Sequence, residues 1–136
     1  MKRAAKTDRN HALLAAARKV RENAVATFSH FGVGAALLGK SGKIYTGCNV
    51  ENATYGLTIC AERVAIFKAL SEGEHAFKAI AVVTDAEKLT PPCGACRQII
   101  WEFCGDAEVI LGNLKGKTEV HRMSALFPLP FDISNL

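Results

Sequence analysis

The first third of the chain carries a helical pattern of apolar residues followed by two extended runs. Between residues 8 and 25 the apolar side chains recur at the spacing of one face of an amphipathic helix, at Leu13, Leu14, Ala17, Val20 and Val25. The apolar runs 33–38 and 43–47 follow, and the short segment 39–42, with glycine at both ends, separates them. Two extended runs joined by a glycine-containing turn are typical of a β-hairpin. We therefore expect a helix and then a hairpin.

The middle of the chain predicts a second helix and a buried strand. The helix should begin near Ile59 and run to about Ser71, ending before Gly73. The segment 79–84 is a short, almost wholly apolar run. Such runs are found in strands that are buried on both faces of a sheet.

The last third predicts one more helix and two more strands. Pro92 is expected to open the helix, because proline is well tolerated in a first helical turn. One stripe of that helix should face the core, formed by Cys96, Ile99, Ile100 and Phe103. The segment 108–111 predicts a fourth strand and 118–121 a fifth, and a short helical turn and a proline-rich tail are expected from Ser124 onward.

A hairpin followed by alternating helices and strands is typical of the α/β class. We predict a three-layer α/β/α sandwich with a mixed five-stranded sheet. The 136 residues contain no internal repeat and no long linker, so residues 1–136 are expected to form a single domain.

Charge and hydropathy argue against two classes of partner. The net charge is +4, but the basic residues are scattered rather than clustered on one face, so no nucleic-acid partner is expected. No apolar run approaches the roughly 18 residues of a membrane helix, and no apolar stretch follows the basic N-terminus as in a secretory signal. The five cysteines are an odd set, which favours free thiols in a reducing compartment. We expect a cytoplasmic protein.

Three of the cysteines stand at predicted helix starts. Cys93 and Cys96 are three residues apart, so both sulfurs should lie on one side of a first helical turn. A lone pair at this spacing fits a zinc pair, a redox pair or coincidence. Cys60, at the start of the preceding helix, supplies a third thiolate. Three protein ligands with one open tetrahedral position are typical of a catalytic zinc ion.

The two residues that follow Cys60-Ala61 suit the chemistry of such a centre. Glu62 could take a proton from water beside the zinc and return it to a substrate, although a carboxylate in a first helical turn also simply complements the helix dipole. Three thiolates leave the zinc centre with a net charge near −1. Arg63 could offset this charge by donating hydrogen bonds to a cysteine sulfur, or could be a solvated surface residue.

A non-enzymatic alternative has four thiolates around a structural zinc ion, with Cys48 or Cys104 as the fourth. It would make the chain a zinc-stapled binding module. Structural sites usually pair two Cys-x-x-Cys motifs, and this chain has one. The open, catalytic interpretation is therefore favoured.

The chain resembles the cytidine deaminase family, specifically its small homotetrameric branch with three zinc-binding cysteines. The resemblance runs from about residue 10 to Phe131. Four motifs carry it in order, at 31–37 (FGVGAAL), 47–52 (GCNVEN), 60–63 (CAER) and 92–98 (PCGACRQ). Cys-x-Glu followed by Pro-Cys-x-x-Cys is the signature of zinc-dependent base deaminases.

The resemblance implies an activity and a set of roles. The activity is hydrolytic deamination of cytidine and deoxycytidine in pyrimidine salvage, with Zn²⁺ as cofactor and Glu62 as proton shuttle. The zinc ligands it implies are Cys60, Cys93 and Cys96. The residues it places around the nucleoside are Phe31 stacking on the pyrimidine, Asn49 and Glu51 on the ribose 3′-hydroxyl, and the Ala61 amide on the pyrimidine carbonyl. Tyr55 and Phe131 match residues that reach into a neighbouring subunit's pocket.

Homotetramer formation is also expected from two apolar features. The helix predicted up to Ser71 is apolar around most of its circumference, and the tail 126–131 is too apolar to be free in solvent. Two rival enzymatic activities remain at this stage. They are deamination of an antibiotic or N4-modified cytosine nucleoside, and deamination of a polynucleotide, which the lack of a basic groove disfavours.

Overall fold

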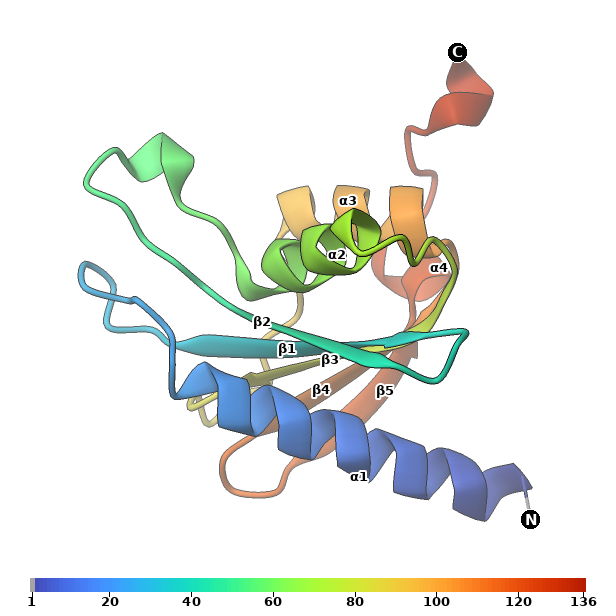
Figure 1. The fold of residues 1–136 in the computed structure, drawn as a ribbon, viewed down its shortest axis with the longest axis horizontal. Coiled ribbons are helices and arrows are strands. Elements are labelled where there is room, and N and C mark those ends of the chain that lie inside the picture. The colour runs from blue at the N-terminus through green and yellow to red at the C-terminus, as the bar shows by residue number, and fades with distance from the viewer. Residues whose placement is uncertain (1) are drawn as a thin grey trace.

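The computed structural model describes residues 2–136, which form one five-stranded sheet with helices on both faces (Figure 1). The strand order is β2-β1-β3-β4-β5. β3 and β4 are parallel and the other neighbouring pairs are antiparallel, which confirms the predicted mixed sheet. The strands are β1 (Val33–Gly39), β2 (Ile44–Cys48), β3 (Phe77–Thr84), β4 (Glu108–Asn113) and β5 (Thr118–Arg122).

The helices make the two outer layers of the predicted sandwich. α1 (Lys2–Arg21) covers one face of the sheet, and its buried Leu13 and Ala17 pack on one core cluster. α2 (Ala61–Ser71), α3 (Gly94–Cys104) and the short α4 (Met123–Leu126) lie over the other face, as Figure 1 shows. The three-layer α/β/α arrangement is therefore confirmed. Among residues 2–136 no helix has the length and hydropathy of a membrane-spanning segment.

The first helix differs from its predicted bounds at both ends. It begins at Lys2 rather than residue 8, because lysine, arginine and alanine are strong helix formers and because Lys6 and Arg9 bind Glu108 at 2.8 and 3.3 Å. It ends at Arg21 rather than at Val25. Val25 instead forms an isolated β-bridge with Val50, in which the Val25 N–H donates to the Asn49 carbonyl oxygen at 3.0 Å.

The two helices that carry the cysteines also begin later than expected. Ile59 forms a β-bridge with Val50, so α2 begins at Ala61 with Cys60 as its N-cap. The prediction that Pro92 opens α3 is wrong. Cys93 is the N-cap, with an extended ψ of 168°, and α3 begins at the following glycine. Cys60 and Cys93 therefore both stand immediately before a helix.

Close backbone contact fixes the position of α2 on the sheet. A Cβ atom built on Gly47 of β2 would lie 2.5 Å from the Ala65 nitrogen and 2.6 Å from the Ala61 oxygen. Only glycine allows this approach. The start of α2, which carries the predicted site residues, is thus held directly against β2.

Candidate metal centre and active site

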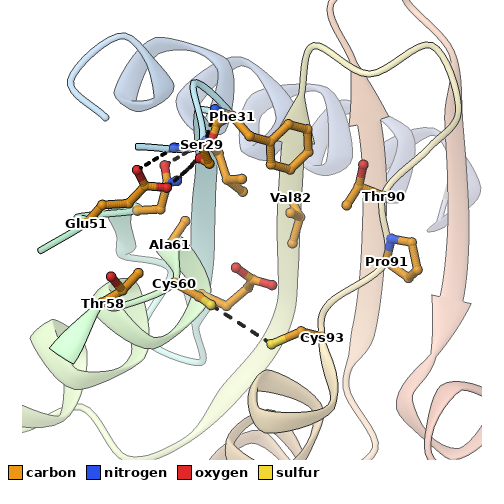
Figure 2. Close-up of a pocket in the computed structure, with 13 residues that line it drawn as sticks. Ser29, Phe31, Glu51, Thr58, Cys60, Ala61, Val82, Thr90, Pro91 and Cys93 are labelled. Atoms are coloured by element: carbon orange, nitrogen blue, oxygen red, sulfur yellow. Dashed lines mark hydrogen bonds between the residues drawn. The ribbon is translucent and has the colours of Figure 1, made fainter. Parts of the chain in front are cut away.

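Three cysteines converge where α2 and α3 begin. Cys60 caps α2, Cys93 caps α3, and Cys96 lies in the first turn of α3. Their three sulfur atoms all lie within 4.8 Å of one another, and the Cys60 and Cys93 sulfurs, which face each other in Figure 2, are 3.9 Å apart. Tetrahedral zinc with bonds of about 2.3 Å holds its sulfurs about 3.8 Å apart. The donor set fits zinc.

The other two cysteines do not join this group. Cys48 ends β2 and Cys104 ends α3, and within residues 2–136 neither belongs to the cluster of sulfurs. Burial raises the pKa of Cys104 to about 12, so its thiol stays protonated at neutral pH. The arrangement supports three protein ligands and an open fourth position rather than a closed structural site.

Arg63 lies against the sulfur cluster. Its Nη2 donates to the Cys60 sulfur at 3.3 Å, and its Nε is buried without a hydrogen-bond partner among the described residues. Hydrogen bonds from Cys96 and then Arg63 lower the pKa of Cys60 to about 5. The pKa of Cys96 moves upward, because it hydrogen-bonds the Cys60 thiolate and is buried. One thiolate forms readily, and a second anion beside it calls for a bound cation.

A cavity of about 260 Å³ opens beside the cysteines. Glu62, in the first turn of α2, lines it with only 4% of the residue exposed, and burial raises the pKa of its carboxyl group to about 7. Ala61, the first residue of α2, is also buried at the wall. Figure 2 shows the Phe31 ring at the end of the cavity away from Cys60 and Cys93. The cavity therefore has an aromatic end and a thiolate end.

Asn49 and Glu51 hold the loop that carries Phe31. The Asn49 Nδ2 donates to the Phe31 carbonyl oxygen and its Oδ1 accepts from the Val33 N–H, both at 2.8 Å. The Glu51 Oε1 accepts backbone N–H groups at 2.8 and 3.0 Å from the segment 28–29, and its Oε2 accepts from the Ser29 hydroxyl. The hydrogen bonds from Ser29, and to a smaller extent the one from the Phe28 N–H, hold the pKa of Glu51 below its usual range. Both side chains therefore shape the cavity wall as well as facing it.

Two predicted site residues lie outside this cavity. Tyr55, in the 3₁₀ turn Tyr55–Leu57, is 72% exposed and packs edge-on against Phe28 with ring centroids 5.4 Å apart. Phe131 is 62% exposed on the segment that follows α4. The structure thus gathers Phe31, Asn49, Glu51, Cys60, Ala61, Glu62 and Cys93 around one cavity with Cys96 buried behind them, and it leaves Tyr55 and Phe131 on the surface.

Some lining residues were not predicted from the sequence. Ser29 lies in the cavity wall and links the Glu51 carboxylate to the Phe31 N–H, which donates to its hydroxyl at 3.0 Å. Its partner is 22 residues away, so no local pattern marks it. The others contribute mostly apolar or hydroxyl surface: Val33, Thr58, Val82, Thr90 and Pro91.

Comparison with known proteins agrees with this geometry. The model of the cytidine and deoxycytidylate deaminase zinc-binding region matches residues 7–113. A cytidine deaminase from Sporosarcina psychrophila is 52% identical, covering 91% of this chain and 92% of that protein. A crystal structure of cytidine deaminase from Burkholderia pseudomallei aligns with a TM-score of 0.87 at 48% identity, covering 89% of this chain and 98% of that one. A blasticidin-S deaminase from Bacillus cereus is 31% identical, covering 73% of this chain and 76% of that protein.

The chain therefore belongs to the cytidine and deoxycytidylate deaminase family. The matched region is a zinc-binding one, and the sulfurs of Cys60, Cys93 and Cys96 form the cluster that fits the ion. The predicted zinc cofactor is confirmed.

Proposed function

We propose that the protein catalyses the zinc-dependent hydrolysis of cytidine and deoxycytidine to uridine and deoxyuridine, releasing ammonia. The observation that carries this proposal is a cluster of three cysteine sulfurs, two of them from residues that line the cavity, beside a buried carboxylate that lines the same cavity. Relatives of about 50% identity over most of the chain are cytidine deaminases. The blasticidin-S deaminase is more distant, which favours a plain cytosine nucleoside over an antibiotic one.

Zinc bound by the three cysteines supplies a water molecule whose pKa is lowered toward neutrality. Glu62 is the group on α2 that can move protons, because its carboxylate lines the cavity two residues after Cys60. It accepts a proton from the attacking water and delivers it to N3 of the pyrimidine. A C4–O bond forms, the C4–N4 bond breaks after a second proton transfer to N4, and ammonia leaves. Water and cytidine thus become uridine and ammonia.

Arg63 supports this chemistry from outside the cavity. Three thiolates around zinc carry a net charge near −1, which would weaken the acidification of bound water. The Arg63 guanidinium, 3.3 Å from the Cys60 sulfur, draws electron density from that ligand through a charge-assisted hydrogen bond. The N-terminal ends of α2 and α3 add positive potential at the same place.

The remaining cavity residues suit a nucleoside. Phe31 offers a ring to a pyrimidine. The Ala61 backbone N–H belongs to the first turn of α2, where it has no intrahelical acceptor, so it is the donor we assign to the pyrimidine carbonyl. Asn49 retains a second amide N–H that makes no hydrogen bond within residues 2–136, and Glu51 retains acceptor capacity on its half-buried carboxylate. These groups suit a ribose 3′-hydroxyl. The Glu51 charge disfavours a nearby phosphate, so nucleosides are preferred to nucleotides.

We further propose a cytoplasmic homotetramer with shared active sites. Apolar side chains remain exposed near the cavity and on α2, among them Tyr55, Leu57 and Phe67. The C-terminal segment adds Leu129, Phe131 and Ile133, which are also exposed. Exposed apolar groups in this number are typical of an interface, and closed symmetric assemblies are the commonest solution. In such an assembly Tyr55 and Phe131 reach a neighbour's cavity.

A substrate panel tests the activity. Purified, zinc-loaded protein is assayed for ammonia release and for the ultraviolet change of cytosine deamination. The panel contains cytidine, deoxycytidine, cytidine 5′-monophosphate, cytosine, blasticidin S and a single-stranded oligodeoxynucleotide. Turnover of cytidine and deoxycytidine far above the other four is expected. Preference for blasticidin S or for the oligonucleotide would refute the proposal in favour of that substrate.

A further inference from the structure

In the C-terminal segment 127–136, Phe127 packs against the core, and Phe131 and Asp132 make polar contacts with α3. Most of its apolar side chains are not buried, and Leu129 is 99% exposed. Three side chains of α3 contact this segment or the residue immediately before it. The Arg97 Nη1 donates to the carbonyl oxygen that ends α4, the Gln98 Nε2 donates to the Phe131 carbonyl oxygen at 2.8 Å, and the Trp101 Nε1 donates to an Asp132 carboxylate oxygen at 2.8 Å.

Asp132 is the centre of these contacts. Its Oδ2 accepts from Trp101, while its Oδ1 accepts the Ser134 N–H at 2.8 Å. Its own N–H donates to the Asn135 side chain at 2.9 Å, which closes a capping box on the terminal 3₁₀ turn Ile133–Asn135. One carboxylate therefore joins the last turn of the chain to the middle of α3. A hydrogen bond to a charged acceptor is stronger than one between neutral groups.

The predicted zinc ligands Cys93 and Cys96 stand at the N-cap and in the first turn of the same helix. Arg97 donates through Nε to the Pro92 carbonyl oxygen at 2.8 Å, immediately before Cys93, and through Nη1 to the end of α4. The first turn of α3 thus lies at the metal centre, and side chains further along α3 contact the C-terminal segment. Trp101 packs on the core that α3 shares with the sheet, so its indole N–H is a fixed donor.

We infer that Asp132 and Trp101 form a latch that fixes the C-terminal segment and so positions Phe131 for nucleoside binding. This inference rests on the proposed function, in which Phe131 contributes to a neighbour's cavity. Asp132 is a positioning residue, since it acts through Phe131. If the latch is broken and the segment is docked for only about a tenth of the time, the apparent affinity for substrate falls about tenfold. The rate of the chemical step, which depends on groups inside the cavity, changes little.

A double-mutant cycle tests the latch. Asp132→Ala removes the acceptor, and Trp101→Phe removes the indole donor while keeping a ring in the core. Each variant is expected to raise KM for cytidine about tenfold, with kcat within about threefold of wild type and full zinc content. The double variant should show no larger rise than either single variant, because the two changes remove one interaction. Asp8→Ala, an exposed carboxylate on α1, is the matched control and should leave KM unchanged.

Spectroscopy reports the latch without any catalytic assay. Trp101 is the single tryptophan, so its emission should shift to longer wavelength in Asp132→Ala as water replaces the carboxylate. Limited proteolysis, followed by intact mass, should remove the C-terminal residues of Asp132→Ala faster than those of wild type. Unchanged emission and proteolysis would overturn the latch. A released segment with unchanged KM, or additive KM effects in the cycle, would overturn its role in binding.

The same data separate this inference from the proposed function. If the wild-type protein does not deaminate cytidine, the proposed function fails. Emission and proteolysis would still decide whether Asp132 holds the segment.

Discussion

Replacing Gly47 by alanine should displace α2 and disturb the metal centre with it. The added Cβ would stand 2.5 Å from the Ala65 nitrogen and 2.6 Å from the Ala61 oxygen. Both are backbone atoms of one helix, so a side-chain rotation cannot relieve the contact. The helix must withdraw by about 1 Å to reach an ordinary carbon contact distance. Cys60 and Glu62 stand at its first turn and would move with it.

The size of the effect follows from that displacement. Overpacking of a tight contact costs about 1–3 kcal/mol of unfolding free energy, which lowers Tm by roughly 3–15 °C for a chain of this size. A shift of about 1 Å at a catalytic centre costs on the order of 10²-fold in rate. We therefore expect Gly47→Ala to be less stable, to bind zinc less tightly and to lose about 10²-fold in kcat/KM for cytidine.

Two other glycines provide the controls. A Cβ on Gly34 would collide with the Ala17 carbonyl oxygen of α1, on the opposite face of the sheet, so Gly34→Ala should lose stability but keep zinc affinity below its Tm. A Cβ on Gly56 meets nothing within 4 Å, so Gly56→Ala should keep its stability. Calorimetry, zinc competition with a chelator and steady-state kinetics measure the three quantities. Wild-type zinc affinity and kcat/KM in Gly47→Ala would refute the reasoning.

Three further predictions concern the proton shuttle, the assembly and acid stability. Glu62→Gln should keep zinc and fold but lose about 10²–10⁴-fold in kcat, and a near wild-type rate would exclude the shuttle role. Light scattering should show a tetramer for the intact protein, and truncation after Pro128 should weaken assembly or cytidine turnover; an active monomer would contradict this. Lys6 first, and then Arg9, hold the pKa of Glu108 below its usual 4.5. The ion pairs of Glu108 therefore stabilise the fold above pH 4.5, and this stabilisation is lost as the pH falls through the pKa of Glu108 in the folded protein. Urea unfolding should therefore separate Glu108→Gln from wild type more at pH 7 than at pH 3.

The sequence by itself determined the elements and the chemistry of the centre. Apolar periodicity is a local property, so it predicted the first helix, the hairpin and the alternation that builds a mixed sheet. The spacing of Cys60, Cys93 and Cys96 predicted a zinc site, because thiolates three apart at a helix start suit one metal ion, and the resemblance of four motifs to a known family identified it as a deaminase site.

The bounds of the elements could not be obtained in this way. Val25 and Ile59 both have apolar side chains that continue a helical pattern, yet both pair with Val50 in β-bridges. Pro92 is a good first helical residue, but its carbonyl oxygen accepts from the side chain of Arg97 and the helix begins after it. For Val25 and Ile59, pairing with Val50 outweighs the local preference.

Only the tertiary structure decided how the site is supported. Ser29 meets Glu51 across 22 residues, and Trp101 meets Asp132 across 31. Such hydrogen bonds depend on which loops and helix faces the packed sheet brings together. The local pattern of apolar and polar residues does not predict these long-range contacts. The sequence states which groups are available for chemistry, whereas the packing of α2 and α3 on the sheet brings them within bonding distance.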